Sequence, residues 1–369
     1  MHELLQPIYL AIFSIFFFVS LFFHFFIKNL FRRIGIVDLP DGEKKKHRMG
    51  VPVSGGISVF FSFTLIILFY FFLILSGFLS NFLDLKMLED SFKFIDYKTG
   101  FLIGLAGLVV AAISFIDDLL DLPAWFRFVA LIICSGVFIS ISGINLTSLG
   151  DLLGFGEIKL NGIAGPLFTI FCVVGVANAF NWIDGLDGLF STQALIAIAV
   201  TFYFISGNGL FLVLFLIAFL PYLLMNLSVF GKKNRVFIGD HGAMGIGYAI
   251  GWFLVSAAEN ELINPMTGPW IIALVLLNAF RAMFKRMLLG VSLFRSDREH
   301  IHHFFLDNGF SKGKSLVIIF LLSIFLVSFG VFLELRQFSE TLSFYLFVSA
   351  FAVWSLLSLS IKKSVTSSR

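Results

Sequence analysis

Acidic and amide side chains are concentrated in one short stretch of this chain, NAFNWIDGLDGL, at residues 178–189. Polar residues recur there at every third position between two apolar runs, as Asn178, Asn181, Asp184 and Asp187. A carboxylate at the centre of a bilayer costs about 2.5–3.5 kcal/mol, so a membrane segment carries such groups only where they are needed. The glycines between them allow a sharp turn, and the helical N-terminus expected after Asp187 would favour phosphate oxygens.

Further carboxylates occur in two other polar segments. In SFIDDLLDLP, Asp117 and Asp121 are four residues apart and would share one face of a continuing helix, with Asp118 turned away. Like charges at this spacing repel by a few tenths of a kcal/mol, unless a cation lies among them. In FIGDHG, Asp240 lies at an expected helix start. Carboxylates on several short loops, with waters and substrate phosphates, are the usual ligands of Mg²⁺.

Basic and imidazole side chains form two clusters. One cluster spans Lys44 to Arg48 and contains Lys45 and His47, and the other consists of Arg298, His300, His302 and His303. Cations near a metal–carboxylate centre suit a substrate with several phosphate charges, as in phosphoryl transfer. Each motif alone also has a plain interpretation: a patch for lipid headgroups, a surface helix, a solvated helix end or a turn. Their joint occurrence favours one functional site.

The composition defines the elements that must position these residues. Of the 369 residues, 59% are hydrophobic and 13% are charged, whereas soluble domains average about 25% charged residues. The chain is therefore expected to be an all-α integral membrane protein with no separate soluble domain and no nucleic-acid partner. Cys134 and Cys172 lie singly in apolar runs, which predicts neither a disulfide nor a metal knuckle. The N-terminal segment is expected to be a first transmembrane helix and not a removable signal peptide.

Apolar runs of roughly 17–25 residues predict the membrane spans. About eleven are found, at 4–27, 53–79, 100–117, 124–145, 163–181, 188–206, 208–229, 241–257, 269–287, 315–334 and 341–361. With the N-terminus outside and the C-terminus in the cytoplasm, the inner segments hold 21 of the 26 Lys and Arg residues, which satisfies the positive-inside rule. We expect a single polytopic domain over 1–369, with catalytic cytoplasmic loops at about 28–52, 117–127, 181–190, 230–243 and 286–314.

In chain order, the polar motifs are D-x-P…K-x-x-H…P-x-x-G-G, S-F-I-D-D, N-A-F-N-W-I-D-G-L-D-G-L, F-I-G-D-H-G and D-R-x-H-I-H-H. This series resembles the polyprenyl-phosphate N-acetylhexosamine-1-phosphate transferases over about residues 28–314. The last motif resembles the branch that initiates O-antigen, enterobacterial common antigen or teichoic acid synthesis more than the branch that initiates peptidoglycan synthesis.

The resemblance implies a reaction, its partners and its location. Polyprenyl phosphate, expected to be undecaprenyl phosphate, would attack a UDP-N-acetylhexosamine to give polyprenyl-diphospho-sugar and UMP. Mg²⁺ is the expected cofactor, with Mn²⁺ as an alternative. The enzyme is expected in the bacterial cytoplasmic (inner) membrane as a multi-pass protein, with its active site facing the cytoplasm. The lipid bilayer and a second copy in a homodimer are the other expected partners.

The resemblance also implies residue roles. Asp117 would orient or deprotonate the lipid phosphate beside Asp118, and Asp240 would bind the metal. Asp184 and Asp187 would support the metal and the diphosphate. The other expected substrate-binding residues are Lys45, His47, Asn178, Asn181, Arg298, His300, His302 and His303.

Three departures from the family pattern are Lys44-Lys45 in place of Arg-Lys, His241-Gly242-Ala243 in place of Gly-Ser, and Asn278 where an aspartate is common. They affect the choice of sugar and the details of the metal site more than the class of reaction. N-acetylglucosamine is the first expectation, and N-acetylgalactosamine or a 6-deoxy-N-acetylhexosamine is the alternative. For the mechanism, a covalent aspartyl-phosphate intermediate is the alternative to a single displacement. For the function, the alternatives are a transporter of a phosphorylated sugar or lipid, a prenyl-chain enzyme and an inactive scaffold.

Overall fold

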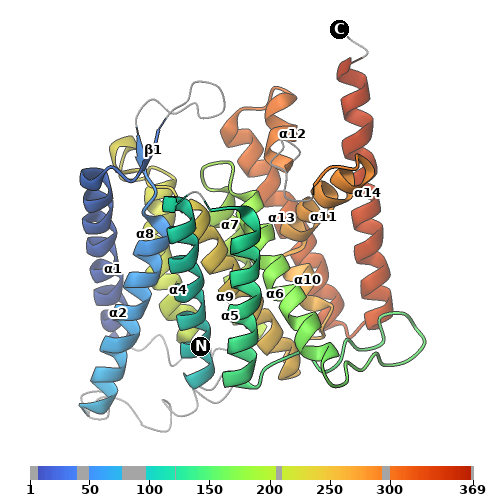
Figure 1. The fold of residues 1–369 in the computed structure, drawn as a ribbon, viewed down its shortest axis with the longest axis horizontal. Helices are drawn as coiled ribbons and strands as arrows, with labels where there is room; N and C mark the ends of the chain where they lie inside the picture. The colour runs from blue at the N-terminus through green and yellow to red at the C-terminus, as the bar shows by residue number, and fades with distance from the viewer. Residues whose placement is uncertain are drawn as a thin grey trace. The chain divides into compact units, whose positions relative to one another are not determined.

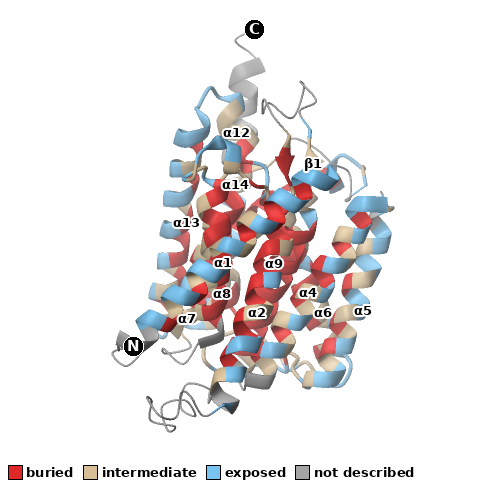
Figure 2. Cartoon of the chain, turned by 90° about the vertical axis from the view of Figure 1, so that its left-hand side faces the viewer, coloured by how far each residue is buried: buried red, intermediate tan, exposed pale blue. Residues whose placement is uncertain are grey.

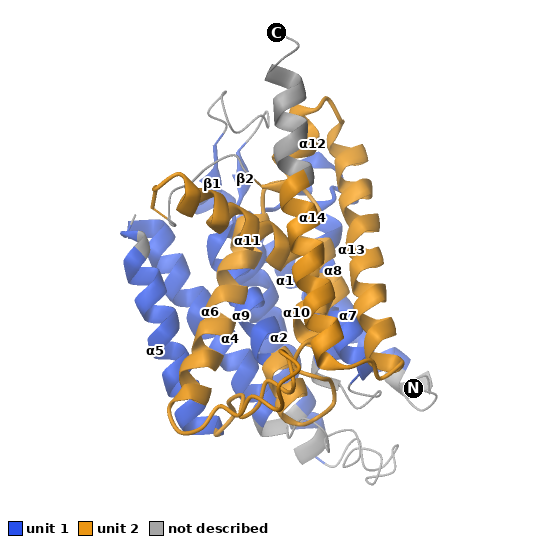
Figure 3. Cartoon of the chain, turned by 90° about the vertical axis from the view of Figure 1, so that its right-hand side faces the viewer, with its two compact units in different colours: residues 1–142, 198–252 blue, residues 143–197, 253–369 orange. Residues whose placement is uncertain are grey.

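The computed structural model describes residues 7–39, 50–76, 97–120, 122–204, 210–292 and 300–366. These residues are mostly helical, which confirms the all-α class. The chain forms two compact units, of which unit 1 comprises residues 1–142 and 198–252 and unit 2 comprises residues 143–197 and 253–369 (Figure 3). Lys45, His47, Asp121 and Arg298 lie outside the described residues, so their predicted roles stay predictions.

Unit 1 is a helical bundle with one short β-hairpin. Its elements are α1 (Pro7–Ile34), β1 (Val37–Asp38), β2 (Val51–Pro52), α2 (Gly55–Leu75), α4 (Tyr97–Leu120), α5 (Ala124–Ser142), α8 (Leu210–Asn226), the 3₁₀-helix η3 (Lys232–Asn234) and most of α9 (Gly239–Glu259). The antiparallel hairpin pairs Val37 with Pro52 and Asp38 with Val51. Helices α1, α2 and α8 pack on one another, and α4 packs on α2 and α5 (Figure 1).

Most of the described part of unit 2 is helical, and residues 143–163 form an irregular segment with an isolated β-bridge between Ser148 and Lys159. Its elements are α6 (Ala164–Ile183), most of α7 (Leu189–Phe204), α10 (Thr267–Ile271), α11 (Ala273–Leu288), α12 (Ile301–Asp307), α13 (Lys312–Leu335) and α14 (Glu340–Thr366). Helix α13 packs on α10, α11 and α12, while α6 and α14 each pack on α11.

Membrane-spanning character follows from length and apolar composition. Five helices of the described residues meet both criteria, at Leu10–Arg33, Thr99–Leu120, Trp125–Ser142, Ala164–Ile183 and Lys312–Leu335, and shorter apolar helices accompany them. Large apolar side chains on them, such as Phe18, Phe171 and Phe325, are exposed, as expected of surfaces that contact lipid. Figure 2 shows exposed positions along α1, α5 and α13. The number and orientation of the spans stay predictions. The predicted span at 269–287 is helical but is divided into two helices, because the helix is interrupted at Ile272 between α10 and α11.

Close helix packing positions the polar end of unit 1. A Cβ atom added to Gly56 at the start of α2 would collide with the backbone of Gly242 in the first turn of α9. Small residues of this kind let two helix backbones approach closely. The three-residue connection after α4 also places the end of α4 beside the start of α5. The end of α4 and the start of α9, which carry the predicted acids, therefore lie together with the start of α5.

Candidate active site

The acidic pair at the end of α4 consists of two carboxylates in different environments. The Asp117 side chain is only 7% exposed, whereas that of Asp118 is 31% exposed. The two residues are adjacent on a helix, so their side chains point about 100° apart. Asp117 therefore faces the protein interior, and Asp118 is the more accessible acid. The predicted partner at the same helix face, Asp121, is not among the described residues.

One arginine joins the first acidic motif to the third. Arg127 in the first turn of α5 donates through Nη1 to Asp117 Oδ2 at 3.4 Å and to Asp240 Oδ2 at 3.3 Å. The two carboxylate oxygens thus converge on a single nitrogen, although the residues are far apart in the chain. Sequence reasoning assigned Arg127 no role beyond membrane topology. The available signal was an arginine inside an apolar helix, which normally requires a partner.

A buried imidazole holds the second acid of the pair. His241 is almost fully buried, and its Nδ1 lies 2.9 Å from Asp118 Oδ2. A carboxylate oxygen can only accept, so His241 Nδ1 is the protonated donor when Asp118 is ionised. The ring also packs edge-on against Phe115, and a Cβ on Gly56 would lie 3.0 Å from its Cδ2. Close packing and this hydrogen bond together fix the imidazole between α9 and α4.

The segment before α9 is attached to α1 by two basic side chains. Lys28 Nζ donates to Asn234 Oδ1 at 2.6 Å, and Arg32 Nη2 donates to the Lys233 carbonyl at 2.9 Å. Two of the cations expected in the inner loops therefore bind the chain itself. Within unit 1, this anchoring positions the 230–243 loop and with it Asp240.

In unit 2, the NAFNWIDGLDGL stretch ends one helix and begins the next. Helix α6 ends at Ile183, Gly188 has a φ of +84°, and α7 begins at Leu189. Asp184 is exposed, while Asp187 is partly buried two residues before α7, as the spacing predicted. Asn178 Nδ2 donates to the Val174 carbonyl at 2.8 Å, so this amide group braces its own helix.

The HIHH segment contacts this turn directly. A Cβ atom added to Gly185 would collide with the His302 ring, so the imidazole lies against the glycine backbone. Burial, together with the neighbouring His303 and His300, lowers the pKa of His302 to about 3. His302 is therefore neutral at physiological pH, and it can act there through hydrogen bonds but not through charge.

Helix α11 supports both parts of the unit 2 cluster. Asn278 Oδ1 accepts from the Ile301 N–H at 2.8 Å, and its amide nitrogen lies 3.3 Å from His300 Nδ1. The Arg286 guanidinium lies 5.0 Å from the ring centroid of Trp182, inside the NAFNWIDGLDGL stretch. The structure thus brings Asn181, Asp184, Asp187, His300, His302 and His303 into one region of unit 2.

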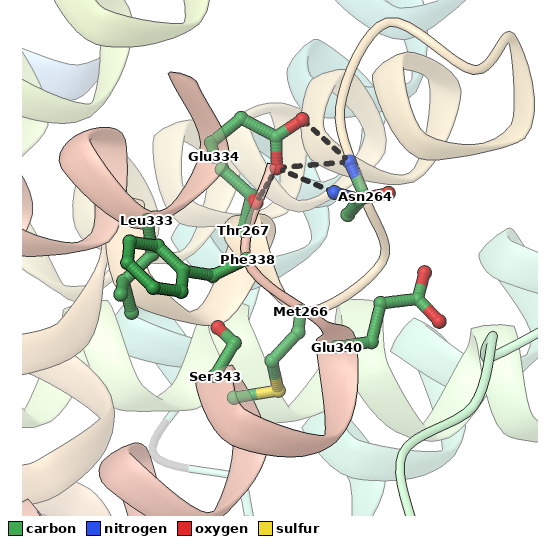
Figure 4. Close-up of a pocket in the computed structure, with 8 residues that line it drawn as sticks. All are labelled: Asn264, Met266, Thr267, Leu333, Glu334, Phe338, Glu340 and Ser343. Carbon is green, nitrogen blue, oxygen red and sulfur yellow. Dashed lines mark hydrogen bonds between the residues drawn. The ribbon is translucent and has the colours of Figure 1, made fainter. Parts of the chain in front are cut away.

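A separate recess lies at the opposite end of α13 from α12 (Figure 4). Glu334 accepts there from the Asn264 side-chain amide at 3.0 Å and from the Thr267 hydroxyl. Helix α13 has 24 residues, so Glu334 lies roughly 33 Å along the axis from Lys312. None of the predicted site residues lines this recess. Its carboxylate is bound by neighbouring donors, which indicates a structural role.

The predicted metal ligand Asp240 has donor atoms of the kind that Mg²⁺ prefers. Mg²⁺ prefers oxygen ligands and is commonly held by one or two carboxylates, waters and substrate phosphates. The Asp240 side chain is 56% exposed, so its oxygens are accessible to a hydrated ion. No group of three or more His, Cys, Asp or Glu side chains suited to a metal occurs in the described part of the chain. An exposed carboxylate such as that of Asp240 fits an ion that is shared with substrate phosphates.

The fold and these clusters define a helical, multi-pass membrane protein whose acids and imidazoles gather at helix ends. The glycosyl transferase family 4 model matches residues 100–258. The chain is 32% identical over 352 residues to the undecaprenyl-phosphate alpha-N-acetylglucosaminyl 1-phosphate transferase of Escherichia coli O157:H7, covering 92% of this chain and 88% of the relative.

Enzymes of the same name from Yersinia pestis and Pasteurella multocida strain Pm70 are each 30% identical, over 346 and 337 residues. They cover 92% and 89% of this chain, respectively, and 88% of each relative. The chain therefore belongs to glycosyl transferase family 4. It is an enzyme of the sugar-1-phosphate transferase class, which confirms the resemblance seen in the motifs.

Proposed function

We propose that the protein transfers an N-acetylhexosamine 1-phosphate, in the first instance N-acetylglucosamine 1-phosphate, from a UDP-sugar to undecaprenyl phosphate. An oxygen of the lipid phosphate attacks the β-phosphorus of the UDP-sugar. The bond from that phosphorus to the bridging oxygen breaks, and UMP leaves with the oxygen and the electron pair. The relatives' names support this lipid and this sugar. A single displacement suits phosphoryl transfer, which depends chiefly on positioning and charge neutralisation.

The observation that carries this proposal is the meeting of Asp117, Arg127 and Asp240. Arginine binds carboxylate and phosphate oxygens with the same fork of N–H donors. In the proposal, an incoming diphosphate competes with the carboxylates for Arg127, which then offsets the charge that develops in the transition state. Asp117 is nearly buried beside Arg127, and we assign it the role of holding this guanidinium in place.

Asp118 is the acid that we propose contacts the lipid phosphate. It is more exposed than Asp117, and its other interaction is the hydrogen bond from His241. That hydrogen bond directs one carboxylate oxygen towards α9, and in the proposal the second oxygen orients a substrate group. His241 is thus a positioning residue in this proposal, because it acts on the substrate only through Asp118.

In unit 2 we assign the polar residues to the nucleotide and the sugar. The exposed Asp184 would serve as a second metal ligand, and Asp187 at the start of α7 would support the diphosphate. Asn181 would bind the nucleotide, and its buried Oδ1 accepts no hydrogen bond from the described residues. Asn178, whose amide group is bound to its own helix, would brace the loop. His302, which is neutral and packs on Gly185, would recognise the sugar through hydrogen bonds.

Asp240 is the carboxylate that we propose binds Mg²⁺, with Mn²⁺ as an alternative. The ion would offset the charge of the diphosphate when bound. We propose that the protein lies in the bacterial inner membrane with its site facing the cytoplasm. Lys and Arg residues concentrate on the cytoplasmic side of membrane proteins, and UDP-sugars are cytosolic. The glycan pathway that uses the product, with O-antigen synthesis as the first expectation, and the homodimer remain predictions.

The test is an assay of UMP release by the purified protein in lipid nanodiscs. We expect release from UDP-N-acetylglucosamine only when both undecaprenyl phosphate and Mg²⁺ are present. A parallel panel of UDP-N-acetylgalactosamine and a UDP-6-deoxy-N-acetylhexosamine identifies the preferred sugar. Release without lipid phosphate would contradict the proposed acceptor, and undiminished release in excess EDTA would contradict the metal.

Two variants assign roles within this assay. Asp240→Asn should reduce turnover at least about 100-fold, while Glu157→Gln, which removes an exposed acid from a unit 2 loop, should not. His302→Ala should raise the KM for the UDP-sugar more than the KM for the lipid phosphate. An equal effect on both substrates would contradict the assignment of His302 to the sugar.

A further inference from the structure

Asn278 of α11 is a buried amide whose two ends contact different groups. It is 1% exposed, its Oδ1 accepts from the Ile301 N–H at 2.8 Å, and its other amide atom lies 3.3 Å from His300 Nδ1. The orientation of an asparagine amide is decided by its partners. A backbone N–H can only donate, so the oxygen must face Ile301 and the NH₂ group must face the imidazole.

This orientation determines where the proton of the imidazole lies. The NH₂ group only donates, so His300 Nδ1 must accept through its lone pair. A neutral imidazole carries one proton, which is then on Nε2. We propose that Asn278 is a positioning residue that keeps His300 as the Nε2–H tautomer, a hydrogen-bond donor to an oxygen of the sugar nucleotide. The choice of ligand rests on the proposed function, whereas the position of the proton does not.

An amide is the side chain at residue 278 that satisfies both neighbours while leaving the proton on Nε2. Aspartate could also accept from Ile301, but its second oxygen would require a proton on His300 Nδ1. Leucine has a similar size, yet it would leave the Ile301 N–H without this acceptor at the start of α12. Asn278 therefore accepts a backbone hydrogen bond through Oδ1 and determines the tautomer of His300 through its NH₂ group.

The other histidines of the HIHH segment lie beside His300. Its ring centroid lies 6.0 Å from that of His302, which in turn lies 4.2 Å from that of His303. Because Nδ1 of His300 accepts from Asn278, the proposal assigns the contribution of His300 to a hydrogen bond from Nε2.

The first test is the tautomer itself. The full-length protein in nanodiscs, labelled with ¹⁵N-histidine, is compared by NMR with a His300→Gln variant to identify the His300 signals. We expect the proton on Nε2 in the native protein and on Nδ1 in Asn278→Asp. A proton on Nδ1 in the native protein would overturn the proposal, whether or not the protein releases UMP.

The second test is kinetic and distinguishes an effect of the proton position on His300 from an effect on the stability of the fold. Asn278→Asp keeps the acceptor for Ile301, so its thermal stability should stay close to native. Its kcat/KM for the UDP-sugar should fall about 10- to 100-fold, because a hydrogen bond to a charged or polar ligand oxygen is lost. Asn308→Asp adds the same charge to an exposed position just after α12 and should change kcat/KM less than about twofold.

Replacement of His300 completes the test. Glutamine can place an N–H donor near the position of Nε2, whereas asparagine can place one only near Nδ1. His300→Gln should therefore retain more activity than His300→Asn, and Asn278→Asp should have little further effect in the His300→Gln background. Equal losses for the two histidine variants, or a full additional loss in the double variant, would overturn the role of Nε2. Inactivity of the native protein with all sugars would instead contradict the proposed function.

Discussion

His241 Nδ1 lies 2.9 Å from Asp118 Oδ2, so the first turn of α9 holds the last turn of α4 through a single buried imidazole. Asp118, the more accessible acid of the α4 pair, is therefore held in one orientation. Arg127 joins the same two helices through Asp117 and Asp240. Two independent polar links thus set the relative positions of three predicted carboxylates.

Replacing His241 should show whether the orientation of Asp118 matters. His241→Leu removes the donor and should lower kcat/KM for the lipid phosphate about 10- to 100-fold, because hydrogen bonds to charged groups contribute about 1.5–3 kcal/mol. His241→Asn can place its NH₂ group near the native Nδ1 position and should recover much of that loss. UMP-release kinetics measure both.

His24→Leu is the matched control for loss of a buried imidazole. His24 Nδ1 contacts the Ser20 carbonyl in its own helix and none of the predicted site residues. This variant should alter stability without changing the KM for either substrate. Equal activity of the leucine and asparagine variants at residue 241 would show that the hydrogen bond to Asp118 is not needed.

Arg127→Gln should impair both activity and folding. It leaves Asp117 in a nearly buried position without its cation, which should lower the free energy of unfolding by about 1–3 kcal/mol. Turnover should fall at least about 100-fold, and Arg127→Lys should recover only part of it, because lysine lacks the planar fork. Lys159→Gln breaks the exposed pair with Glu157 and should leave the stability close to that of the native protein, because solvent screens exposed charges. A loss of stability with native turnover would restrict Arg127 to a structural role.

The low pKa of His302 predicts a loss of stability in acid. In the unfolded chain this imidazole takes up a proton below about pH 6.5, but in the folded protein it does so only near pH 3. The stabilising effect of the neutral ring is therefore complete above pH 6.5 and falls as the pH decreases towards 3. The difference in thermal midpoint between pH 7 and pH 5 should be smaller in His302→Leu than in the native protein. An identical difference would contradict the burial of a neutral His302.

Gly185→Ala should displace His302. The added Cβ would collide with the imidazole ring, so turnover should fall at least about tenfold and the thermal midpoint should drop. Gly175→Ala on α6 is the matched control, since a Cβ there meets no atom within 4 Å. In the double variant with His302→Ala, stability should return while turnover stays low. If Gly185→Ala and Gly175→Ala behave alike, the proposed contact is wrong.

Apolar length and glycine placement allowed much of the local structure to be predicted from sequence. Helices occur in every expected span, α9 begins with Gly239 and Asp240, and a turn at 184–188 separates α6 from α7. These features depend on neighbours in the chain, because a run of apolar residues must form helix in lipid, where backbone polar groups have no other partner. The interruption at Ile272 was not predicted, since its apolar neighbours give no local signal.

The sequence by itself determined which residues could do chemistry: the acids, amides and imidazoles of the polar motifs. Only the tertiary structure decided what holds them. Arg127 and Asp240 are 113 positions apart, His241 and Asp118 are 123 apart, and Asn278 and Ile301 are 23 apart. Hydrogen bonds of this kind depend on helix packing and on which side chains become buried together. Residue spacing along one helix cannot report them, which is why Arg127, His241 and Asn278 acquire their partners only in the folded chain.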